Sequence, residues 1–266
     1  MSQSNHRPVV SLRSLFPRVQ VQLPGFNMIT GLVLVLTVIH LLMVRIQGSA
    51  EGQAEAAWYY INFGLSWHGF SDGKIWQIVT YGLMHANWAH LLMNLLMLWL
   101  IGGRVIHILG HRRCFWIIVL GTVAGGLMHL LTGLLFLRTG YPESHLVGIS
   151  GACLALLVTL TTLSPDSRMW PVPISGKNLG LGFIIASLLL WLMQPGLGLP
   201  LFSGMGELMV NWAGPELFQI SHGCHLGGAL AGWWLARRLL APTPSLETLQ
   251  KLRQKREKKI GLGDLG

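Results

Sequence analysis

Six long apolar stretches are the feature that most limits what this chain of 266 residues can fold into. A transmembrane helix needs about 20 apolar residues, because each residue adds about 1.5 Å and the hydrocarbon core is about 30 Å thick. Only 11% of the residues are charged, against about 25% in an ordinary soluble domain. The sequence therefore predicts an all-α membrane protein with six transmembrane helices, at residues 27–46, 83–103, 115–137, 146–164, 179–194 and 222–240.

Lysine and arginine residues predict the orientation, since short loops rich in them stay in the cytoplasm. With the N-terminus inside, all of them lie on the cytoplasmic side except Arg45, Lys74 and Arg138. This topology, with a basic tail beside anionic lipid, explains the net charge of +9, so we expect no nucleic-acid partner. Both termini are then cytoplasmic, and the chain divides into an N-terminal arm (1–26), a six-span domain (27–240) and a basic tail (241–266).

The segments between the stretches add three expectations. The compact six-span layout without a transit peptide favours an integral, multi-pass protein of the bacterial inner membrane. Glycine and proline interrupt residues 195–221, which predicts an interfacial or re-entrant loop on the outer face. The tail has leucines at helical spacing beside cations, which fits either a surface-lying amphipathic helix or disorder.

Polar side chains inside the predicted spans are costly in lipid, and each is therefore a candidate for function. In the second span, His90 and Asn94 are four residues apart and share one helical face. His85 comes five residues before His90, and we expect it near the outer end of the same helix.

The fourth and sixth spans carry the matching groups. Ser150 lies between Gly148 and Gly151, and His225 lies about one turn inside the sixth span. Gly228 and Gly232 follow His225 in a spacing that lets a neighbouring helix approach closely. All these groups are near outer ends, so we expect them at one depth.

This combination indicates acyl-transfer chemistry. A serine is a weak nucleophile and needs a base within hydrogen-bond reach, which His225 could provide for Ser150. The tetrahedral intermediate carries an oxyanion that needs donors, which His90, Asn94 and the backbone at Ser150 could supply.

Each residue has a simpler interpretation when it is considered alone. A single membrane serine usually bonds to its own helix, and single histidines or asparagines often only join helices. Metal chemistry is not expected, because the H-E-x-x-H motif is absent and Cys114, Cys153 and Cys224 have no ligand spacing. An aspartyl pair is excluded by the three Asp residues, which all fall in predicted loops or the tail. We expect structural roles for the other histidines considered: His40, His107, His111 and His129.

Three linked motifs resemble the rhomboid family of intramembrane serine proteases. They are H-x4-H-x3-N from His85 to Asn94, G-I-S-G from Gly148 to Gly151, and the glycines that follow His225. The resemblance covers roughly residues 70 to 240, with the motifs on the second, fourth and sixth spans.

The resemblance implies a six-helix, rhomboid-like bundle that cleaves transmembrane proteins near the outer membrane face without a cofactor. It implies Ser150 as nucleophile and His225 as general base and then acid. His90, Asn94 and the Gly148–Ser150 backbone would surround the oxyanion, and Gly148 and Gly151 would allow the turn this backbone needs. The supporting residues would be His85, Gly151, Gly228 and Gly232.

The chain also departs from the family pattern at two positions. The usual tryptophan–arginine pair of the first outer loop is Trp76–Gln77, and the tyrosine often found one turn after the serine is Leu154. These changes leave open an inactive relative that binds or escorts membrane clients. A transporter is a third class, but transporter sites usually lie at the bilayer midplane, whereas these polar groups gather near one face.

Overall fold

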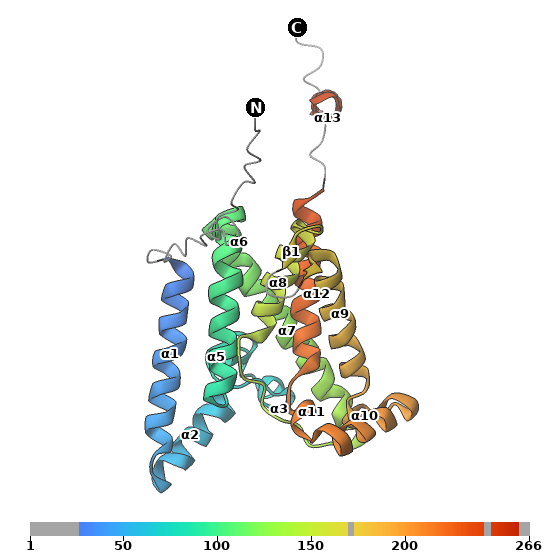
Figure 1. Cartoon of the computed structure of the whole chain (residues 1–266). Coiled ribbons are helices and arrows are strands. Elements are labelled where there is room, and N and C mark those ends of the chain that lie inside the picture. Colours follow the sequence, from blue (N-terminus) through green and yellow to red (C-terminus); the bar gives the residue numbers. More distant parts are fainter. Residues whose placement is uncertain (1–26, 170–172, 242–245, 261–266) are drawn as a thin grey trace, which may run out of the picture.

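The fold is almost entirely helical, as Figure 1 shows for the computed structural model. The structure describes residues 27–169, 173–241 and 246–260. Its helices are α1 (Met28–Gln47), α2 (Ala50–Phe63), α3 (Trp67–Ser71), α4 (Gln77–Thr80), η2 (Tyr81–Leu83), α5 (Trp88–Met97), η3 (Leu98–Gly102), α6 (Gly103–Leu109), α7 (His111–Thr139), α8 (Ser150–Leu163), α9 (Gly176–Leu192), η4 (Pro195–Leu197), α10 (Pro200–Ala213), α11 (Glu216–Gln219), α12 (His222–Leu239) and α13 (Leu246–Ile260).

Helix α8 is the centre of the bundle. Eleven of its 14 residues are buried, because α7, α9 and α12 all pack against it. Small residues permit the closest of these approaches: a Cβ added at Gly228 or Gly232 of α12 would collide with the α8 backbone. The two helices are therefore held backbone to backbone along their length.

A second packed region joins α1 to the helices near the centre. Ile29 and Leu36 of α1 form a buried apolar cluster with Leu91 and Leu98 of the α5–η3 segment and with Leu156 of α8. Helix α5 continues through η3, a π-helical turn, into α6. This unbroken stretch from Trp88 to Leu109 corresponds to the second predicted span.

Among the described residues, three helical stretches are long and apolar enough to cross a membrane: Met28–Gln47, Trp88–Leu109 and His111–Thr139. Helices α8 and α9 are apolar but shorter. With 14 residues, α8 extends only about 21 Å, less than the roughly 30 Å hydrocarbon core. The six-span layout with cytoplasmic termini therefore stays a prediction, and the short α8 leaves its first residue recessed within the bundle.

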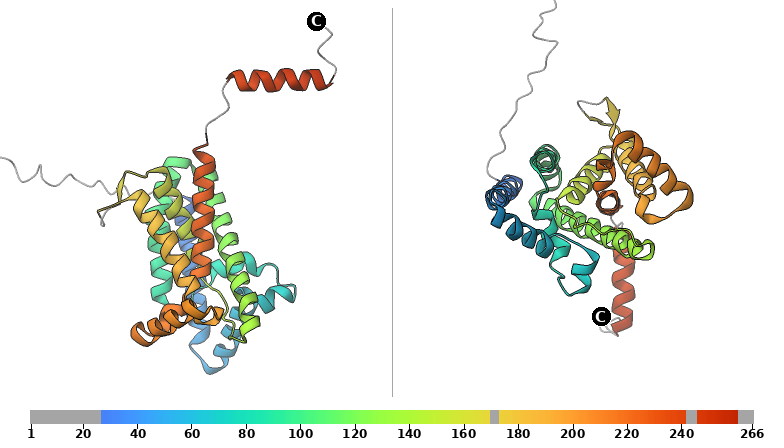
Figure 2. Two further views of the ribbon diagram at one scale, coloured as in Figure 1. Left: turned by 90° about the vertical axis from the view of Figure 1, so that its right-hand side faces the viewer. Right: turned by 90° about the horizontal axis from the view of Figure 1, so that it is seen from below.

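Shorter helices lie across the lower end of the bundle in Figure 1, where α3 and α11 are found. Figure 2 shows α2 and α10 on opposite sides of this end. The segment predicted as a loop at 195–221 is thus partly helical, with α10 starting at Pro200. Leu201, Leu208 and Trp212 of α10 are largely exposed, which fits the predicted interfacial position.

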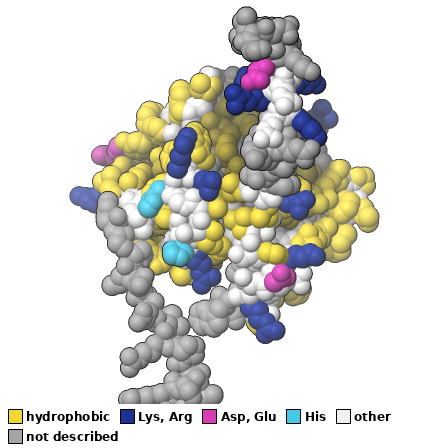
Figure 3. All heavy atoms as spheres, turned by 90° about the horizontal axis from the view of Figure 1, so that it is seen from above, with side chains coloured by type: hydrophobic (Ala, Val, Ile, Leu, Met, Phe, Trp, Pro, Cys, Tyr) yellow, Lys and Arg dark blue, Asp and Glu magenta, His cyan; other side chains and the backbone are white. Residues whose placement is uncertain are grey.

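The opposite end carries the basic residues. Figure 3 looks onto this end and shows lysine and arginine side chains gathered around an apolar body. A short antiparallel strand pair lies there between α8 and α9, formed by β1 (Arg168–Met169) and β2 (Ile174–Ser175). The predicted N-terminal arm at 1–26 lies outside the described residues, whereas part of the basic tail forms α13.

Candidate active site

Ser150 is the first residue of α8, and the chain reaches it through an extended segment. The predicted span at 146–164 is wrong at its start, because residues 146–149 are not helical. Leu146 pairs with Leu65 in an isolated bridge, and the Gly148 amide donates to the Tyr81 carbonyl at 2.9 Å. Gly148 has φ +104°, a conformation that glycine adopts readily. The turn therefore places the half-buried Ser150 at the start of α8.

His225 lies one turn into α12 and faces Ser150. Ser221 starts this helix and accepts the Cys224 amide proton at 3.3 Å. The Nε2 atom of His225 is 2.9 Å from the Ser150 hydroxyl oxygen, within hydrogen-bond distance. Both side chains are half-buried, so the pair is shielded from the bulk surroundings but not sealed.

His90 and Asn94 come from α5 and lie beside the turn that precedes Ser150. A Cβ added at Gly148 would collide with the His90 ring and lie 3.4 Å from the Asn94 side-chain nitrogen. That nitrogen is buried and has no hydrogen-bond partner among the described residues. A buried donor without a partner is rare and calls for an explanation, and here it lies beside the Gly148 turn that precedes the serine.

His85 is buried beside His90 but is not part of α5. The sequence interpretation placed it in the outer end of the helix, and this is wrong: α5 begins at Trp88, because Asn87 caps it by accepting the His90 amide proton. The ring centroids of His85 and His90 are 5.2 Å apart in an edge-to-face arrangement. Tyr60 of α2 donates to the His85 carbonyl at 3.0 Å, which fixes this loop.

Gly151 has a packing role and not the turn-forming role expected from the sequence. It does not have a positive φ, unlike Gly148. A Cβ at Gly151 would approach the Cys224 sulfur and the Gly121 carbonyl oxygen, both at 3.1 Å. Its lack of a side chain lets α7 and α12 close around the first turn of α8.

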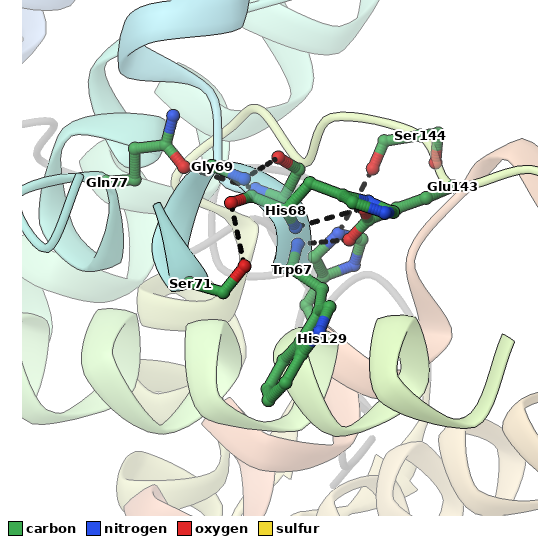
Figure 4. A network of polar contacts seen from close by, with 9 residues as sticks. Trp67, His68, Gly69, Ser71, Gln77, His129, Glu143 and Ser144 are labelled. Carbon is green, nitrogen blue, oxygen red and sulfur yellow. Dashed lines mark hydrogen bonds and ion pairs between the residues drawn. The ribbon is translucent and has the colours of Figure 1, made fainter. Parts of the chain in front are cut away.

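Two residues whose partners the sequence does not reveal connect the loop before Ser150 to its surroundings. Figure 4 shows Glu143 accepting hydrogen bonds from the backbone amides of Trp67 and His68 at the start of α3. The Glu143 carboxylate is also 2.6 Å from the Nδ1 atom of His68. The sequence offers no signal for this pairing, because His68 and Glu143 are 75 residues apart.

His129 of α7, for which the sequence predicted a structural role without naming partners, contacts the segments before both Ser150 and His225. Its Nε2 is 3.3 Å from the Ser144 carbonyl oxygen, and its Nδ1 is 3.1 Å from the Ser221 hydroxyl. A carbonyl only accepts, so Nε2 carries the proton and Nδ1 accepts from Ser221 when the ring is neutral. Its position inside an apolar span was the one available signal.

Gln77, at the position where the family usually has arginine, fixes the first outer loop with its amide. Its side chain is fully buried. The amide nitrogen donates to the Ile61 carbonyl at 2.9 Å, and the amide oxygen accepts the Ser66 amide proton at 3.4 Å. Gln77 therefore joins the end of α2 to the start of α3 without a charge.

Within the described part of the chain, no group of three or more His, Cys, Asp or Glu side chains is arranged to hold a metal ion. The reactive groups at this site are the Ser150 hydroxyl and the His225 imidazole, with the Asn94 amide and the His90 ring as nearby N–H donors. Fold and site together define an α-helical protein with helices of membrane-spanning length and a serine–histidine pair recessed between them.

Comparisons with known proteins agree with this class. A family model described as a rhomboid domain matches residues 72–242. The chain is 29% identical to the rhomboid protease GlpG of Photorhabdus laumondii over 174 residues, which are 60% of this chain and 56% of that protein. It is 30% identical over 182 residues to uncharacterized proteins of Mycobacterium bovis and Mycobacterium tuberculosis, covering 68% of this chain and 65% of each relative.

Because the matched domain covers more than half of it, the chain belongs to the rhomboid family. Family membership and the apolar helices together make it a membrane protein. The matches span 56 to 65% of the length of these relatives.

Proposed function

We propose that the protein is an intramembrane serine endopeptidase. The observation that carries the proposal is the 2.9 Å distance between the Ser150 hydroxyl oxygen and His225 Nε2. Membership of the rhomboid family and the likeness to a rhomboid protease support the same activity. The two side chains come from residues 75 apart in sequence, so their meeting depends on the close packing of α8 and α12.

In the first step, Ser150 attacks the carbonyl carbon of a substrate peptide bond. His225 Nε2 takes the hydroxyl proton, which requires the neutral ring to carry its own proton on Nδ1. The C–N bond then breaks, His225 returns the proton to the leaving amine, and an acyl-enzyme ester remains on Ser150. A water molecule, deprotonated by His225, attacks this ester and frees the serine.

The oxyanion of the two tetrahedral intermediates needs hydrogen-bond donors. We assign this role to the Asn94 side-chain nitrogen, His90 and the Ser150 backbone amide. The Asn94 nitrogen has no partner among the described residues and lies near the Gly148 turn, so it is free to donate. A donor already in place when charge develops stabilises the transition state without reorganisation.

The substrates would be transmembrane proteins cut near the outer membrane face. A helical segment keeps its peptide bonds internally hydrogen-bonded, so the substrate must unwind locally before Ser150 reaches it. The proposal includes the six spans predicted from the apolar stretches, the cytoplasmic termini predicted from the basic residues, and a bacterial inner membrane. Substrates with Gly, Pro or other small residues near their outer boundary are then preferred.

A fluorophosphonate probe tests the activation of Ser150 without requiring a known substrate. The purified wild type is expected to label at one serine, and Ser150→Ala and His225→Ala are expected to abolish the labelling. Ser187→Ala is the matched control, since Ser187 is a buried serine on α9. Equal labelling of wild type and Ser150→Ala would refute the proposal.

A further inference from the structure

A groove lies between α9 and α12 at the basic end of the bundle, at the other end of α8 from Ser150. It has a volume of about 400 Å³. Its floor comes from the last turns of α8, including Val158. Nothing in the proposed proteolytic reaction uses this groove, and its role is independent of that reaction.

The walls of the groove place cations above apolar side chains. On α9, Lys177 comes one turn before Leu181 and two turns before Ile184, all on one helical face. On α12, Arg237 follows Trp233 by one turn. Both helices thus present a charge at the end of the bundle and hydrocarbon or aromatic surface deeper in.

Among the residues that the structure describes, neither cation has an acidic partner. Lys177 and Arg237 form no ion pair within the described residues, and no acidic side chain lines the groove. Asp166, next to the lining residue Pro165, is exposed and not part of the lining. Arg238 differs from its neighbour, because it stacks on the Trp234 ring at 5.2 Å.

The apolar walls of the groove are partly exposed. Leu181 is 50% exposed and Trp233 is 47% exposed, although both are on helices that pack against the bundle. Such surface is stable when hydrocarbon covers it, and tryptophan is favoured at the membrane–water boundary. The groove therefore offers cations for a phosphate at the end of the bundle and apolar surface for an acyl chain deeper in. A phospholipid has its charged headgroup and its acyl chains in the same order.

We infer that this groove binds one anionic phospholipid, with its phosphate between Lys177 and Arg237 and an acyl chain along Leu181, Ile184 and Trp233. Basic pockets between membrane helices recognise anionic headgroups through such charge pairs, and each cation near the membrane surface contributes to the attraction. A bound lipid would bridge α9 and α12 at the basic end of the bundle, where the last turns of α8 form the floor of the groove between them.

Native mass spectrometry of the detergent-purified full chain tests this site with defined lipids. Phosphatidylglycerol and phosphatidylcholine with identical acyl chains are added at equal concentration. The wild type is expected to retain one phosphatidylglycerol in preference to phosphatidylcholine. The double variant Lys177→Gln with Arg237→Gln is expected to lose this preference by about tenfold or more.

A control variant separates the groove from general charge. Arg112→Gln with Arg113→Gln removes the same charge at the start of α7, outside the groove, and is expected to retain the lipid. Leu181→Asn is expected to weaken retention without changing charge, and this variant decides the matter if the double variant fails to fold. Inorganic phosphate is not expected to displace the lipid, because it lacks an acyl chain.

Three results would overturn the site. The first is the same preference for phosphatidylglycerol in the wild type and in the Lys177→Gln, Arg237→Gln variant. The second is a loss of this preference in the Arg112→Gln, Arg113→Gln control as large as in that variant. The third is displacement of the bound lipid by inorganic phosphate alone. Because the readout is lipid retention, failure here leaves the fluorophosphonate result unchanged.

Discussion

The side-chain nitrogen of Asn94 is buried without a partner among the described residues, as are both ring nitrogens of His85. The enclosure of this amide carries a cost that a hydrogen bond to a charged transition state would offset. Under the proposed function, this unpaired donor serves the oxyanion.

Replacing Asn94 with Leu should therefore affect turnover more than stability. We expect kcat for a transmembrane reporter to fall by about 10²- to 10³-fold, the usual loss for one oxyanion donor. KM and the thermal unfolding midpoint should change little. Asn62→Leu, at an exposed position on α2, is the control and should leave kcat unchanged. An unchanged kcat in Asn94→Leu would remove this residue from the mechanism.

Gly148 shows how closely backbone and site are linked at one residue. Its φ of +104° strains any side chain, and a Cβ would collide with His90. Gly148→Ala should lower the free energy of unfolding by about 1 to 3 kcal/mol and also reduce fluorophosphonate labelling. Gly103→Ala, where a Cβ meets nothing within 4 Å, should have neither effect. Denaturant unfolding and labelling of both variants check this.

At the scale of elements, α8 and α12 hold the reacting pair through their glycines. In Gly228→Ala, the added Cβ would collide with the Gly151 carbonyl. Because Gly151 directly follows Ser150, a shift of the Gly151 backbone would also move Ser150. We expect a loss of about 1 to 3 kcal/mol in stability, with much slower labelling of Ser150. Gly182→Ala on α9 has open space around it and should behave like the wild type. Labelling at the wild-type rate in Gly228→Ala would show that this contact does not set the geometry.

His129 connects the elements that carry the pair, because it bonds to Ser144, six residues before Ser150, and to Ser221, four residues before His225. His129→Leu keeps a similar volume but removes both bonds, and we expect kcat to fall by about tenfold or more through misplacement of the pair. His129→Gln offers a donor and an acceptor and should restore part of the rate. Thr132→Val, one turn later on α7, should lower stability with a smaller effect on kcat, since Thr132 bonds to Trp191 of α9. No rescue by His129→Gln would argue against positioning.

The parts predicted well from the sequence are those set by local pattern. The bounds expected at 27–46 and 222–240 correspond closely to the helices Met28–Gln47 and His222–Leu239, of which the first is also long and apolar enough to cross a membrane. The starts of α5 and α8 were missed, because Asn87 capping and the Leu65–Leu146 bridge depend on local geometry and distant partners. The partners of His129, for which only a structural role was predicted, were missed for the same reason, since they come from two other segments.

At the scale of the whole molecule, charge and hydrocarbon surface set the orientation. Lysine and arginine gather at one end (Figure 3), while the Ser150–His225 pair lies toward the opposite ends of α8 and α12. Because basic segments resist translocation, the basic end should face the cytoplasm and the reacting pair should open outward. This separation fits cleavage at the outer face.

Reporter fusions test that orientation in a bacterial host. A C-terminal green fluorescent protein should fluoresce, and C-terminal alkaline phosphatase should be inactive, because both report a cytoplasmic end. Alkaline phosphatase inserted after Gly204 in α10 should be active. The opposite pattern would show that the topology is reversed, with the Ser150–His225 pair facing the cytoplasm, and would contradict cleavage at the outer face.

The most direct test of the central claim is cleavage of a transmembrane reporter reconstituted with the purified protein in liposomes. The wild type should release a fragment cut near the outer boundary of the reporter helix, identified by its mass. Ser150→Ala and His225→Ala should release none while keeping the wild-type unfolding midpoint. Release of the same fragment at the wild-type rate by either variant would contradict a Ser150–His225 mechanism.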